Sequence, residues 1–525
     1  MYLSQVRITN FRIFESLDLA LSPGLNLIVG ENDSGKSALI DAIRFVLRTR
    51  DYEWFRLTRD DFHVGSDGER AQELRIECRF EGFNKKEASC FLEWLGVESA
   101  AQESQDPLYF LRVWLEATRK EPEETSGRFD REIAVDFRAG PEDTGIRIHG
   151  EARDLLRATY LKPLRDAESE LAAKRGSRLS QILLAHPEVK ADKESITAII
   201  DKANQEVRDQ RSISDRIDSL NRSYLSHFIL GNDPVLAGVD ISPTELRDVL
   251  ETLQLLLIDG EEQEEVTKHG LGLDNLLFMA AELLLLQSPE GPVSSLVLIE
   301  EPEAHLHPQL QLRLVEFLER QAQSTSSDSN GRRRIQVLMT SHSPNLASRM
   351  DLQHLVIMHE GEAYPMASQY TRLEDDDYGF LRRFLDVTKA SLFFARGVLI
   401  VEGHAEQILL PTIAKLMGRP LSKYGVSAVN VGHTGLFRYA RIFQRTDGSD
   451  TKVRVACVAD LDIPPAEAEG YLRRDSEGNL TQQTTSSISP DEQAEIRSDR
   501  VHSLGASVRT YVSDQWTLEY DTACF

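Results

Sequence analysis

A glycine-bounded segment close to the N-terminus has the residue types of a phosphate-binding loop. Residues 30–37 read Gly-Glu-Asn-Asp-Ser-Gly-Lys-Ser, which fits the pattern GxxxxGK[ST] in full. The glycines let backbone N–H groups turn inward around phosphate oxygens, and a helix that starts there favours negative charge. We expect Lys36 to reach the β- and γ-phosphates of ATP and the hydroxyl of Ser37 to bind Mg²⁺. The remaining nucleotide contacts are expected from Gly30, Asn32, Ser34 and Gly35.

Two adjacent glutamates, Glu300 and Glu301, follow the apolar run Leu296–Ile299. In P-loop ATPases a carboxylate at the end of a buried strand holds Mg²⁺, and a neighbouring group orients the attacking water. We therefore expect Glu300 to bind Mg²⁺ and Glu301 to act as the catalytic base. Two neighbouring carboxylates at a buried edge are costly without a cation, which disfavours a role as a plain surface turn.

Two further segments are candidates for completing this site. His342 lies in Thr340–Pro344, directly after another apolar run, and is expected to sense the γ-phosphate. A lone histidine is more often structural, but its place after the glutamate pair favours the sensing role. Gly270 and Gly272 lie in a glycine-rich segment before a helix, and such a loop could cap the γ-phosphate bound to a partner subunit. A simple helix cap explains the two glycines equally well.

A second set of carboxylates lies in the last quarter of the chain. Glu402 and the pair Asp460 and Asp462 each follow an apolar run, and Glu406 comes four residues after Glu402. Carboxylates at the C-terminal edge of parallel strands point into the usual ligand crevice. Four of them would repel one another unless divalent cations bind, and two cations can clamp the oxygens of a phosphodiester. Oxygen-only ligands favour Mg²⁺ or Mn²⁺ over Zn²⁺, and acidic surface loops are the competing interpretation.

The elements that must position these residues form an α/β pattern. Apolar runs predict strands at 2–8, 25–29, 74–81, 108–117, 295–299, 335–340, 398–401, 427–431 and 453–460. Amphipathic spacing predicts helices at 33–47, 249–258, 274–286, 308–322 and 406–417, a helical connector at 370–390, and a polar loop at 475–490. The charged stretch 165–228 predicts two or three inserted helices, which are either a solvated decoration or a subunit-pairing element.

The composition restricts the class of protein. The chain has 525 residues, 41% of them hydrophobic, which is enough for two or three domains. Its formal net charge of -25 excludes coating of nucleic acid by overall attraction, so DNA contact would need local basic patches. Four scattered cysteines fit neither a zinc site nor a disulfide framework. With no signal pattern and no apolar run long enough to span a membrane, we expect a soluble cytoplasmic protein.

Basic residues gather around the second acidic set. They could form a track for DNA phosphates beside the metals, although charged helix faces are common. The candidates are Arg382, Arg383, Lys389, Arg396, His433, Arg438, Arg441, Arg445, Lys452 and Arg454. No motif that reads bases is visible, so the sequence predicts no particular cleavage site.

The motifs above, in this order, resemble the ATPase heads of the SMC and ABC group. The sequence is more similar still to the OLD (overcoming lysogenization defect) family of ATP-dependent nucleases. The resemblance covers nearly the whole chain and is carried by Ile8–Arg12, Tyr160–Asp166, Glu301–Pro308 and Thr340–Pro344. Glu300 stands where Asp is commoner in ABC ATPases, which suits the OLD group.

The resemblance implies a fold and a division of the chain. It implies an ABC-type P-loop ATPase domain with a helical dimerisation insert, followed by a Toprim domain. The corresponding segments are 1–164 and 231–390 for the ATPase, 165–230 for the insert and 391–525 for the Toprim domain. The insert then serves subunit pairing in a homodimer or a higher homo-oligomer.

The Toprim resemblance adds two metal ligands and one departure. Glu402-Gly and Asp460-x-Asp462 are similar to the Toprim pattern of topoisomerases, primases and OLD nucleases. Trp516–Asp521 resembles an OLD segment that supplies a hydroxyl and a carboxylate, here Thr517 and Glu519. Family members normally continue further and contain a later lysine, whereas this sequence stops at Phe525. A truncated chain, an impaired nuclease and a sufficient metal site all stay open as explanations.

The expected function is an ATP-binding and ATP-hydrolysing, metal-dependent endonuclease of double-stranded DNA, acting in phage defence or DNA processing. Its cofactors would be ATP with Mg²⁺ or Mn²⁺, and two divalent cations (Mg²⁺, Mn²⁺ or Ca²⁺) at the Toprim site. The alternative is an ATP-gated sensor or scaffold with a weak Toprim site and a companion protein, helicase-like or effector, in a defence complex. A transport or repair ATPase without cleavage is less favoured.

Overall fold

The structure is a computed structural model of the chain. It describes residues 1–49, 56–98, 108–120, 133–162, 177–223, 237, 245–253, 256–259, 262–265, 271–286, 295–304, 306–323, 335–432, 435–449, 451–475, 480–481, 483–502 and 508–524. Among these residues, no helix combines the length and the apolar composition that crossing a bilayer requires. Cys78, Cys90 and Cys457 are free thiols.

The N-terminal part is a sheet in the strand order β2-β1-β4-β6-β7-β8, with β5 also paired to β6. All of its pairings are antiparallel. Its strands are β1 (Tyr2–Phe11), β2 (Phe14–Ala20), β4 (Glu73–Glu81), β5 (Leu95–Glu98), β6 (Leu108–Arg119), β7 (Ile133–Ala139) and β8 (Ile146–Arg147). Short helices connect them or follow them: η1 (Arg59–Asp61), α2 (Lys85–Ser89) and α3 (Gly150–Asp154).

A second sheet, in the order β15-β14-β3-β13-β12-β9, is parallel except for β15. Its strands are β3 (Leu25–Gly30), β9 (Thr159–Leu161), β12 (Leu296–Glu300), β13 (Gln336–Ser341), β14 (Leu355–His359) and β15 (Glu362–Pro365). Every residue of β3, β12 and β13 is buried, as expected for apolar runs in a sheet that is covered on both faces. Because these strands are parallel, Gly30, Glu300 and Ser341 end at the same edge.

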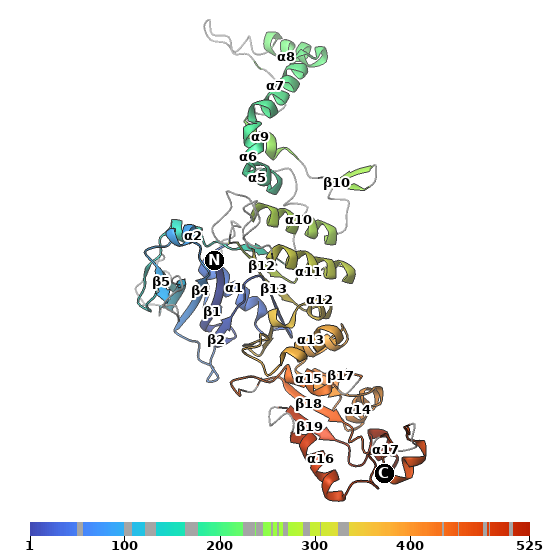
Figure 1. The fold of residues 1–525 in the computed structure, drawn as a ribbon. Coiled ribbons are helices and arrows are strands. Elements are labelled where there is room, and N and C mark those ends of the chain that lie inside the picture. The colour runs from blue at the N-terminus through green and yellow to red at the C-terminus, as the bar shows by residue number, and fades with distance from the viewer. Residues whose placement is uncertain are drawn as a thin grey trace.

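Helix α1 (Lys36–Leu47) lies between the two sheets and contacts strands of both. This position explains why ten of its twelve residues are buried, whereas a surface helix would bury one stripe. Figure 1 shows three further helices on the side of the second sheet away from α1. They are α10 (Leu271–Leu286), α11 (Pro308–Gln323) and α12 (Pro344–Arg349), and the short helix η4 (Leu352–His354) follows α12 in sequence.

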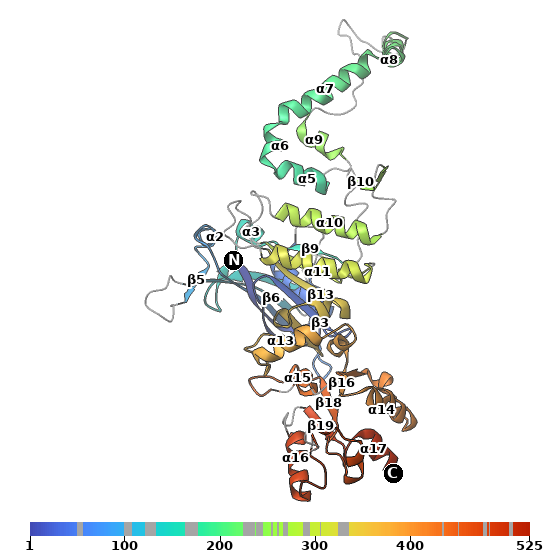
Figure 2. The same ribbon diagram turned by 45° about the vertical axis from the view of Figure 1, so that its right-hand side comes forward.

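A helical arm projects away from these sheets in both views (Figures 1 and 2). It contains α5 (Arg178–Ala185), α6 (Pro187–Ala191), α7 (Lys193–Asp209), α8 (Arg211–Ser223) and α9 (Leu246–Glu251). The insert was expected to begin at residue 165, and residues 163–176 lie outside the described part of the chain. Two helices of the arm bury little: Asn204 is the buried residue of α7, and α8 has none, whereas α9 buries Leu246, Val249 and Leu250.

The helix expected at 249–258 is wrong over its second half. α9 ends at Glu251, and β10 (Leu256–Asp259) pairs with β11 (Glu262–Glu265) in an antiparallel hairpin. A short apolar run cannot be assigned to helix or strand by periodicity alone. The Asp-Gly step at 259–260 was the available signal for a hairpin.

The C-terminal part is a four-stranded parallel sheet in the order β17-β16-β18-β19. Its strands are β16 (Gly397–Val401), β17 (Val426–Asn430), β18 (Arg454–Ala459) and β19 (Val508–Val512). Its helices are α14 (His404–Leu416), η6 (Leu421–Tyr424), α15 (Leu436–Arg441), η7 (Ala466–Tyr471), α16 (Pro490–His502) and α17 (Leu518–Cys524). The sequence analysis assigned neither β19 nor α16 and α17.

The connector between the two halves is α13 (Asp375–Phe384) followed by η5 (Lys389–Phe394). Leu392 and Phe393 of η5 are buried, and η5 contacts β3, α12 and β17. One hydrophobic cluster therefore runs without a break from Val29, beside the phosphate loop, to Val398 and Val455 in the third sheet. The two halves therefore share a hydrophobic core and are not separate domains joined by a linker.

Candidate nucleotide and metal sites

The segment 30–37 joins β3 to α1, as the motif requires. Gly30 has φ +153, and a Cβ atom there would lie 2.1 Å from the carbonyl oxygen of Met358. Gly35 has φ +109, and a Cβ atom there would lie 2.8 Å from the ring of Phe14. Both positions therefore require glycine for backbone conformation and for space.

Lys36 lies inside the curve of this loop and is buried. Its amine donates to the carbonyl oxygens of Gly30 (3.0 Å) and Glu31 (2.6 Å) and lies 3.4 Å from the hydroxyl of Ser34. Burial lowers the pKa of Lys36 to about 8, against the opposing effect of Glu301 and other carboxylates. A buried cation at the centre of a loop of backbone N–H groups fits the binding of phosphate.

Glu300, at the end of β12, meets Ser37 as the sequence predicts. Ser37 lies close enough to Glu300 to oppose the rise of its pKa, and Tyr160 of β9 donates its phenolic hydrogen to Glu300 Oε2. Burial raises the pKa of Glu300. Its other oxygen, Oε1, is buried with no hydrogen-bond partner among the described residues. A hydroxyl and an orphaned carboxylate oxygen side by side fit a divalent cation.

Tyr160 has a place in this site that its sequence motif did not predict. The guanidinium of Arg44 stacks over its ring, 3.7 Å from the centroid, and Arg44 also pairs with Asp41 at 2.7 Å. Burial and the bond to Glu300 raise the pKa of Tyr160, which keeps the phenol a proton donor. No spacing in the sequence links residue 160 to residue 300, so this contact could not be read from it.

Glu301 and His342 also come together. His342 Nε2 lies 3.4 Å from Glu301 Oε1, and Glu301 has the unusual φ of +43. Burial lowers the pKa of His342, and the charge of Lys36 lowers it further, while Glu301 opposes both. The structure thus places the expected base, the expected γ-phosphate sensor and the loop lysine within electrostatic reach of one another.

Glu303 is a residue of this site that the sequence analysis missed. One of its carboxylate oxygens accepts the backbone N–H of His342 at 2.7 Å and the hydroxyl of Ser341 at 2.9 Å. Its other oxygen is buried without a hydrogen-bond partner among the described residues, and burial raises its pKa. Glu303 therefore fixes the segment that carries His342, and the third glutamate in Glu-Glu-Pro-Glu was the signal for it.

The two glycines that were expected to cap a partner's γ-phosphate have no described contact with this site. Gly270 lies outside them, and Gly272 lies in the first turn of α10, which begins at Leu271. The expected loop before residue 274 is therefore helical at Gly272. Their contact with the nucleotide of a partner subunit stays a prediction.

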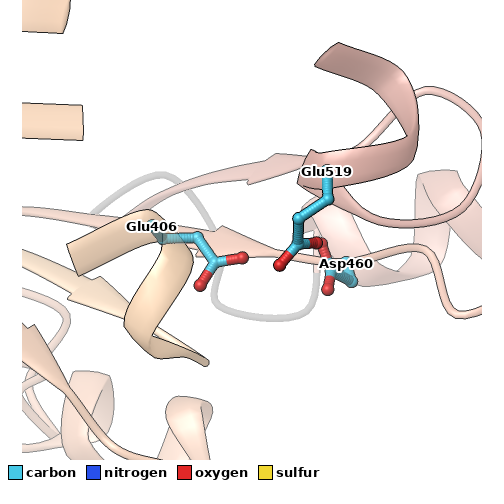
Figure 3. A group of neighbouring side chains, drawn as sticks. All are labelled: Glu406, Asp460 and Glu519. Atoms are coloured by element: carbon cyan, nitrogen blue, oxygen red, sulfur yellow. The ribbon is translucent and has the colours of Figure 1, made fainter. Parts of the chain in front are cut away.

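The second acidic set gathers at the end of the third sheet. Carboxylate oxygens of Glu406, Asp460 and Glu519 all lie within 4.8 Å of one another, although the three residues come from α14, the end of β18 and α17. Figure 3 shows the three side chains turned toward a common point. Glu406 is only 4% exposed, and its Oε2 has no hydrogen-bond partner among the described residues. A buried, unpartnered carboxylate facing two others fits a divalent cation.

Glu402 and Asp462 lie beside this group. Burial, together with the charges of Asp462 and Asp460, raises the pKa of Glu402 to about 7, while the charge of Arg500 opposes the rise. Burial raises the pKa of Asp460 to about 6, and neighbouring carboxylates add to the effect. The N–H of Leu518 donates to Asp460 Oδ1 at 3.0 Å, which ties the start of α17 to the acidic set.

Two residues near this set differ from expectation. The hydroxyl oxygen of Thr517 accepts the N–H of Tyr520 at 3.3 Å and so caps α17, and its role as a metal ligand stays a prediction. Arg500 of α16, which was not singled out, donates to the carbonyl oxygen of Asp460 and lies 3.3 Å from Asp462 Oδ2. It is 38 residues from Asp462 in sequence, so no motif could reveal it.

Half of the expected phosphate track is engaged in ion pairs inside the chain. Arg438 and Arg441 face Asp377, whose side chain is 2% exposed, at 3.5 and 2.8 Å. Arg445 is buried and donates to the carbonyl oxygen of Pro365. A buried carboxylate needs such partners, so these arginines join α13 and β15 to the third sheet.

The other members of the track divide into paired and exposed residues. Lys389 pairs with Asp386, and Lys452 lies 3.5 Å from Glu362. His433 lies outside the described residues. The exposed members are Arg382, Arg383, Arg454 and Arg396, which pairs with Glu31. Contact of these residues with DNA phosphates stays a prediction.

Arg396 links the phosphate loop to the third sheet. Its Nε lies 2.6 Å from Oε2 of Glu31, the second residue of the loop, and it directly precedes β16. Nδ1 of His359 lies 3.6 Å from the other oxygen of Glu31. The side chain of Glu31 is largely buried between these two partners.

Two family models match the chain. The family described as "AAA domain, putative AbiEii toxin, Type IV TA system" matches residues 25–348. The family described as "Overcoming lysogenization defect protein-like, TOPRIM domain" matches residues 393–462. Together they include the phosphate loop, Glu300, Glu301, His342, and the acidic residues from Glu402 to Asp462.

Two curated proteins are similar over most of the chain. "Endonuclease GajA" of Bacillus cereus strain VD045 is 24% identical over 452 residues, which cover 84% of this chain and 72% of that protein. "OLD nuclease" of Thermus scotoductus is 22% identical over 418 residues, covering 77% and 72%. Among solved structures, the Smc head domain of Pyrococcus furiosus bound to the C-terminal domain of ScpA is 15% identical, with a TM-score of 0.40 over 69% of this chain and 95% of that chain.

Proposed function

Because the chain belongs to the AAA-domain family of the first model and carries an OLD-like Toprim domain, we propose that it is an ATP-hydrolysing, divalent-metal-dependent DNA endonuclease. One observation carries the nuclease part: Glu406, Asp460 and Glu519 meet from three separate elements, with Glu406 buried and Oε2 unpartnered among the described residues. Glu406 is buried, Asp460 is half-buried and Glu519 is exposed, and a cation would offset both their mutual repulsion and the lost hydration of Glu406.

The proposed ATP chemistry follows from the contacts of the loop. Lys36 would turn from the loop carbonyls to the β- and γ-phosphates, and Ser37 with Glu300 would hold Mg²⁺, which neutralises charge on the phosphates. Tyr160 and Glu303 act through others: Tyr160 orients Glu300, and Glu303 orients His342. Glu301 would take a proton from the attacking water, with His342 beside it at the γ-phosphate.

The proposed DNA chemistry uses the second acidic set. Its carboxylates, with Thr517, would hold Mg²⁺ or Mn²⁺, which supplies positive charge at the phosphodiester. The chain's own part is orientation: the N–H of Leu518 donates to Asp460 and holds its carboxylate in place. The metal ligands would be Glu402, Glu406, Asp460, Asp462, Thr517 and Glu519.

We also propose the domain limits and the assembly. The ATPase is assigned to residues 1–164 and 231–390, the dimerisation insert to 165–230 and the Toprim domain to 391–525. The projecting arm of α5 to α9 supports a pairing role, since α7 and α8 bury few of their residues within one chain. Homodimers would place Gly270 and Gly272 of one subunit at the γ-phosphate of the other.

A cleavage assay tests the proposal. Purified protein is incubated with supercoiled plasmid and Mg²⁺ or Mn²⁺, with and without ATP, beside Asp460→Ala. An exposed carboxylate of the same domain, Asp447, gives the matched control Asp447→Ala. We expect nicked or linear DNA from the wild type and the control only. Equal cutting by Asp460→Ala would show that the metal site is wrongly assigned.

The cellular role is proposed from the OLD resemblance alone: phage defence or DNA processing in the cytoplasm, with a companion protein in some settings. Phage plating on cells that express the wild type or Asp460→Ala would test it. If purified protein binds ATP but cuts with neither metal and retains a partner, the sensor or scaffold role is the better description.

A further inference from the structure

The carboxylates of the third sheet fall into two unequal groups. Glu406, Asp460 and Glu519 offer three oxygens to one point. Among the described residues this is the one group of three or more possible ligands at such spacing. Glu402 and Asp462 stand next to it and influence each other electrostatically, but they bring no third carboxylate of their own. A cation at this second position would have fewer protein ligands than one at the first.

A permanent positive charge of the chain lies at this second position. Arg500 Nη1 donates to the carbonyl oxygen of Asp460 and lies 3.3 Å from Asp462 Oδ2, and its charge also reaches Glu402. The bond to a backbone carbonyl fixes the guanidinium in place more firmly than attraction to a mobile carboxylate would. Arginine stays protonated under all working conditions.

The fold fixes this arrangement through an apolar cluster beneath it. Leu461, which lies between the two aspartates, is fully buried with Ile463, Ile488 and Val512. Ile496 and Val501 of α16 pack on the same cluster and flank Arg500. The helix that carries the cation and the turn that carries Asp460 and Asp462 are therefore packed as one unit, and Asp462 itself adopts φ +59 in that turn.

We propose that Arg500 is the resident cation of the second position, so that the Toprim site binds one divalent cation tightly, at Glu406, Asp460 and Glu519. A second cation beside Glu402 and Asp462 is then repelled by the guanidinium. This inference rests on the proposed nuclease function and deepens it, because it replaces the two-cation expectation with one ion and one arginine. In this scheme Arg500 supplies a fixed positive charge beside Glu402 and Asp462.

Counting bound Mn²⁺ tests this directly. Free Mn²⁺ is titrated by electron paramagnetic resonance in nucleotide-free full-length protein, with Glu300→Gln in every variant to remove ions at the ATP site. We expect one tight ion per chain when position 500 is unchanged, and also in Arg500→Lys. In Arg500→Gln, a second ion should bind at least about tenfold more tightly than before, because a like charge is removed.

Two controls keep the result interpretable. Arg497 lies one turn earlier on α16 and pairs with Asp514, away from Asp462, so Arg497→Gln should keep one ion. Asp460→Ala should lose the tight ion. Thermal melting of each variant checks that α16 stays packed.

The outcomes separate this inference from the proposed function. Two equally tight ions in the wild type, or an unchanged count in Arg500→Gln, would overturn the role of Arg500 while leaving the nuclease proposal intact. One tight ion in the wild type and a second in Arg500→Gln, in a protein that cuts no DNA, would support the inference and contradict the nuclease proposal. No tight Mn²⁺ in the wild type would overturn both.

Discussion

The ATP site and the Toprim site both lie where parallel strands end, yet they treat buried carboxylates differently. In the ATP site, Glu300 accepts a phenolic hydrogen from Tyr160, and Glu303 accepts the backbone N–H of His342. In the Toprim site, Glu406, Asp460 and Glu519 face one another. The carboxylates of the first site face hydroxyl and N–H donors, whereas those of the second site face one another, although the N–H of Leu518 donates to Asp460.

This difference indicates which of the two sites needs a bound cation to keep its geometry. A carboxylate that accepts hydrogen bonds is partly compensated before any ligand arrives, so the ATP site is organised in advance. Carboxylates that face each other cost free energy until a cation binds. The Toprim site should therefore hold its geometry well only with metal, and removal of charge there should stabilise the metal-free chain.

The largest effect is expected from removing the loop cation. Lys36→Ala should weaken ATP binding by about a hundredfold or more, because a desolvated charge pair is lost. Mn²⁺ binding at the Toprim site should not change, since that site has its own ligands. Titration with a fluorescent ATP analogue measures the first, and Lys415→Ala, an exposed lysine on α14, is the control. ATP binding within a factor of about three of wild type would refute the role of Lys36.

The next effect concerns the charge of the Toprim site. Burial raises the pKa of Glu402 to about 7 and that of Asp460 to about 6, both above the values of an unfolded chain. Between about pH 4 and pH 7 the folded state therefore binds more protons, so these groups make the metal-free protein more stable as the pH falls through that window. In chelator, Asp460→Asn should raise Tm near neutral pH and flatten this dependence.

Saturating Mg²⁺ provides the control for this prediction. A bound cation favours the ionised carboxylates, so it should remove the gain in stability that acidification gives. Thermal melting at several pH values, with chelator or with Mg²⁺, measures both effects. The assigned pKa values would be contradicted if the metal-free protein lost stability as the pH fell from about 7 to about 4, to the same degree in the wild type and in Asp460→Asn.

The same contrast explains how much could be read from the sequence. Lys36, Ser37, Glu300 and Glu301 lie in short motifs next to apolar runs, and parallel strands bring such motifs to one edge. Glu402, Glu406, Asp460 and Asp462 were identified by the same logic, and the structure brings them close together. The position of Glu519 came only from the family resemblance, because no spacing relates residue 519 to residue 406.

What the sequence could not provide are contacts between distant polar side chains. Tyr160 with Glu300, and Arg500 with Asp462, join elements whose pairing depends on the whole tertiary fold. The partners of the predicted basic track were hidden for a related reason. The sequence shows that Arg438 and Arg441 are near each other, but it does not show that both form ion pairs with the buried Asp377.

A smaller effect is expected from the phenol of the ATP site. Tyr160→Phe removes one hydrogen bond to a carboxylate and should lower kcat for ATP by about tenfold, with little change in the affinity for ATP alone. The control is Tyr439→Phe, which removes a buried hydroxyl bonded to the carbonyl of Phe384. Steady-state ATPase assays over a range of Mg²⁺ measure the effect. Equal kcat in both variants would make Tyr160 a packing residue only.

The smallest effect should come from the contact that joins the two sites. Arg396→Gln removes the partner of Glu31 in the phosphate loop and should change ATP affinity by only about two- to threefold, because the arginine is largely exposed. The change should disappear in high salt, which screens exposed pairs. Arg419→Gln, an exposed arginine of the same domain, is the control. Equal ATP affinity in Arg396→Gln and Arg419→Gln at low salt would show that the pair of Arg396 with Glu31 does not contribute to nucleotide binding.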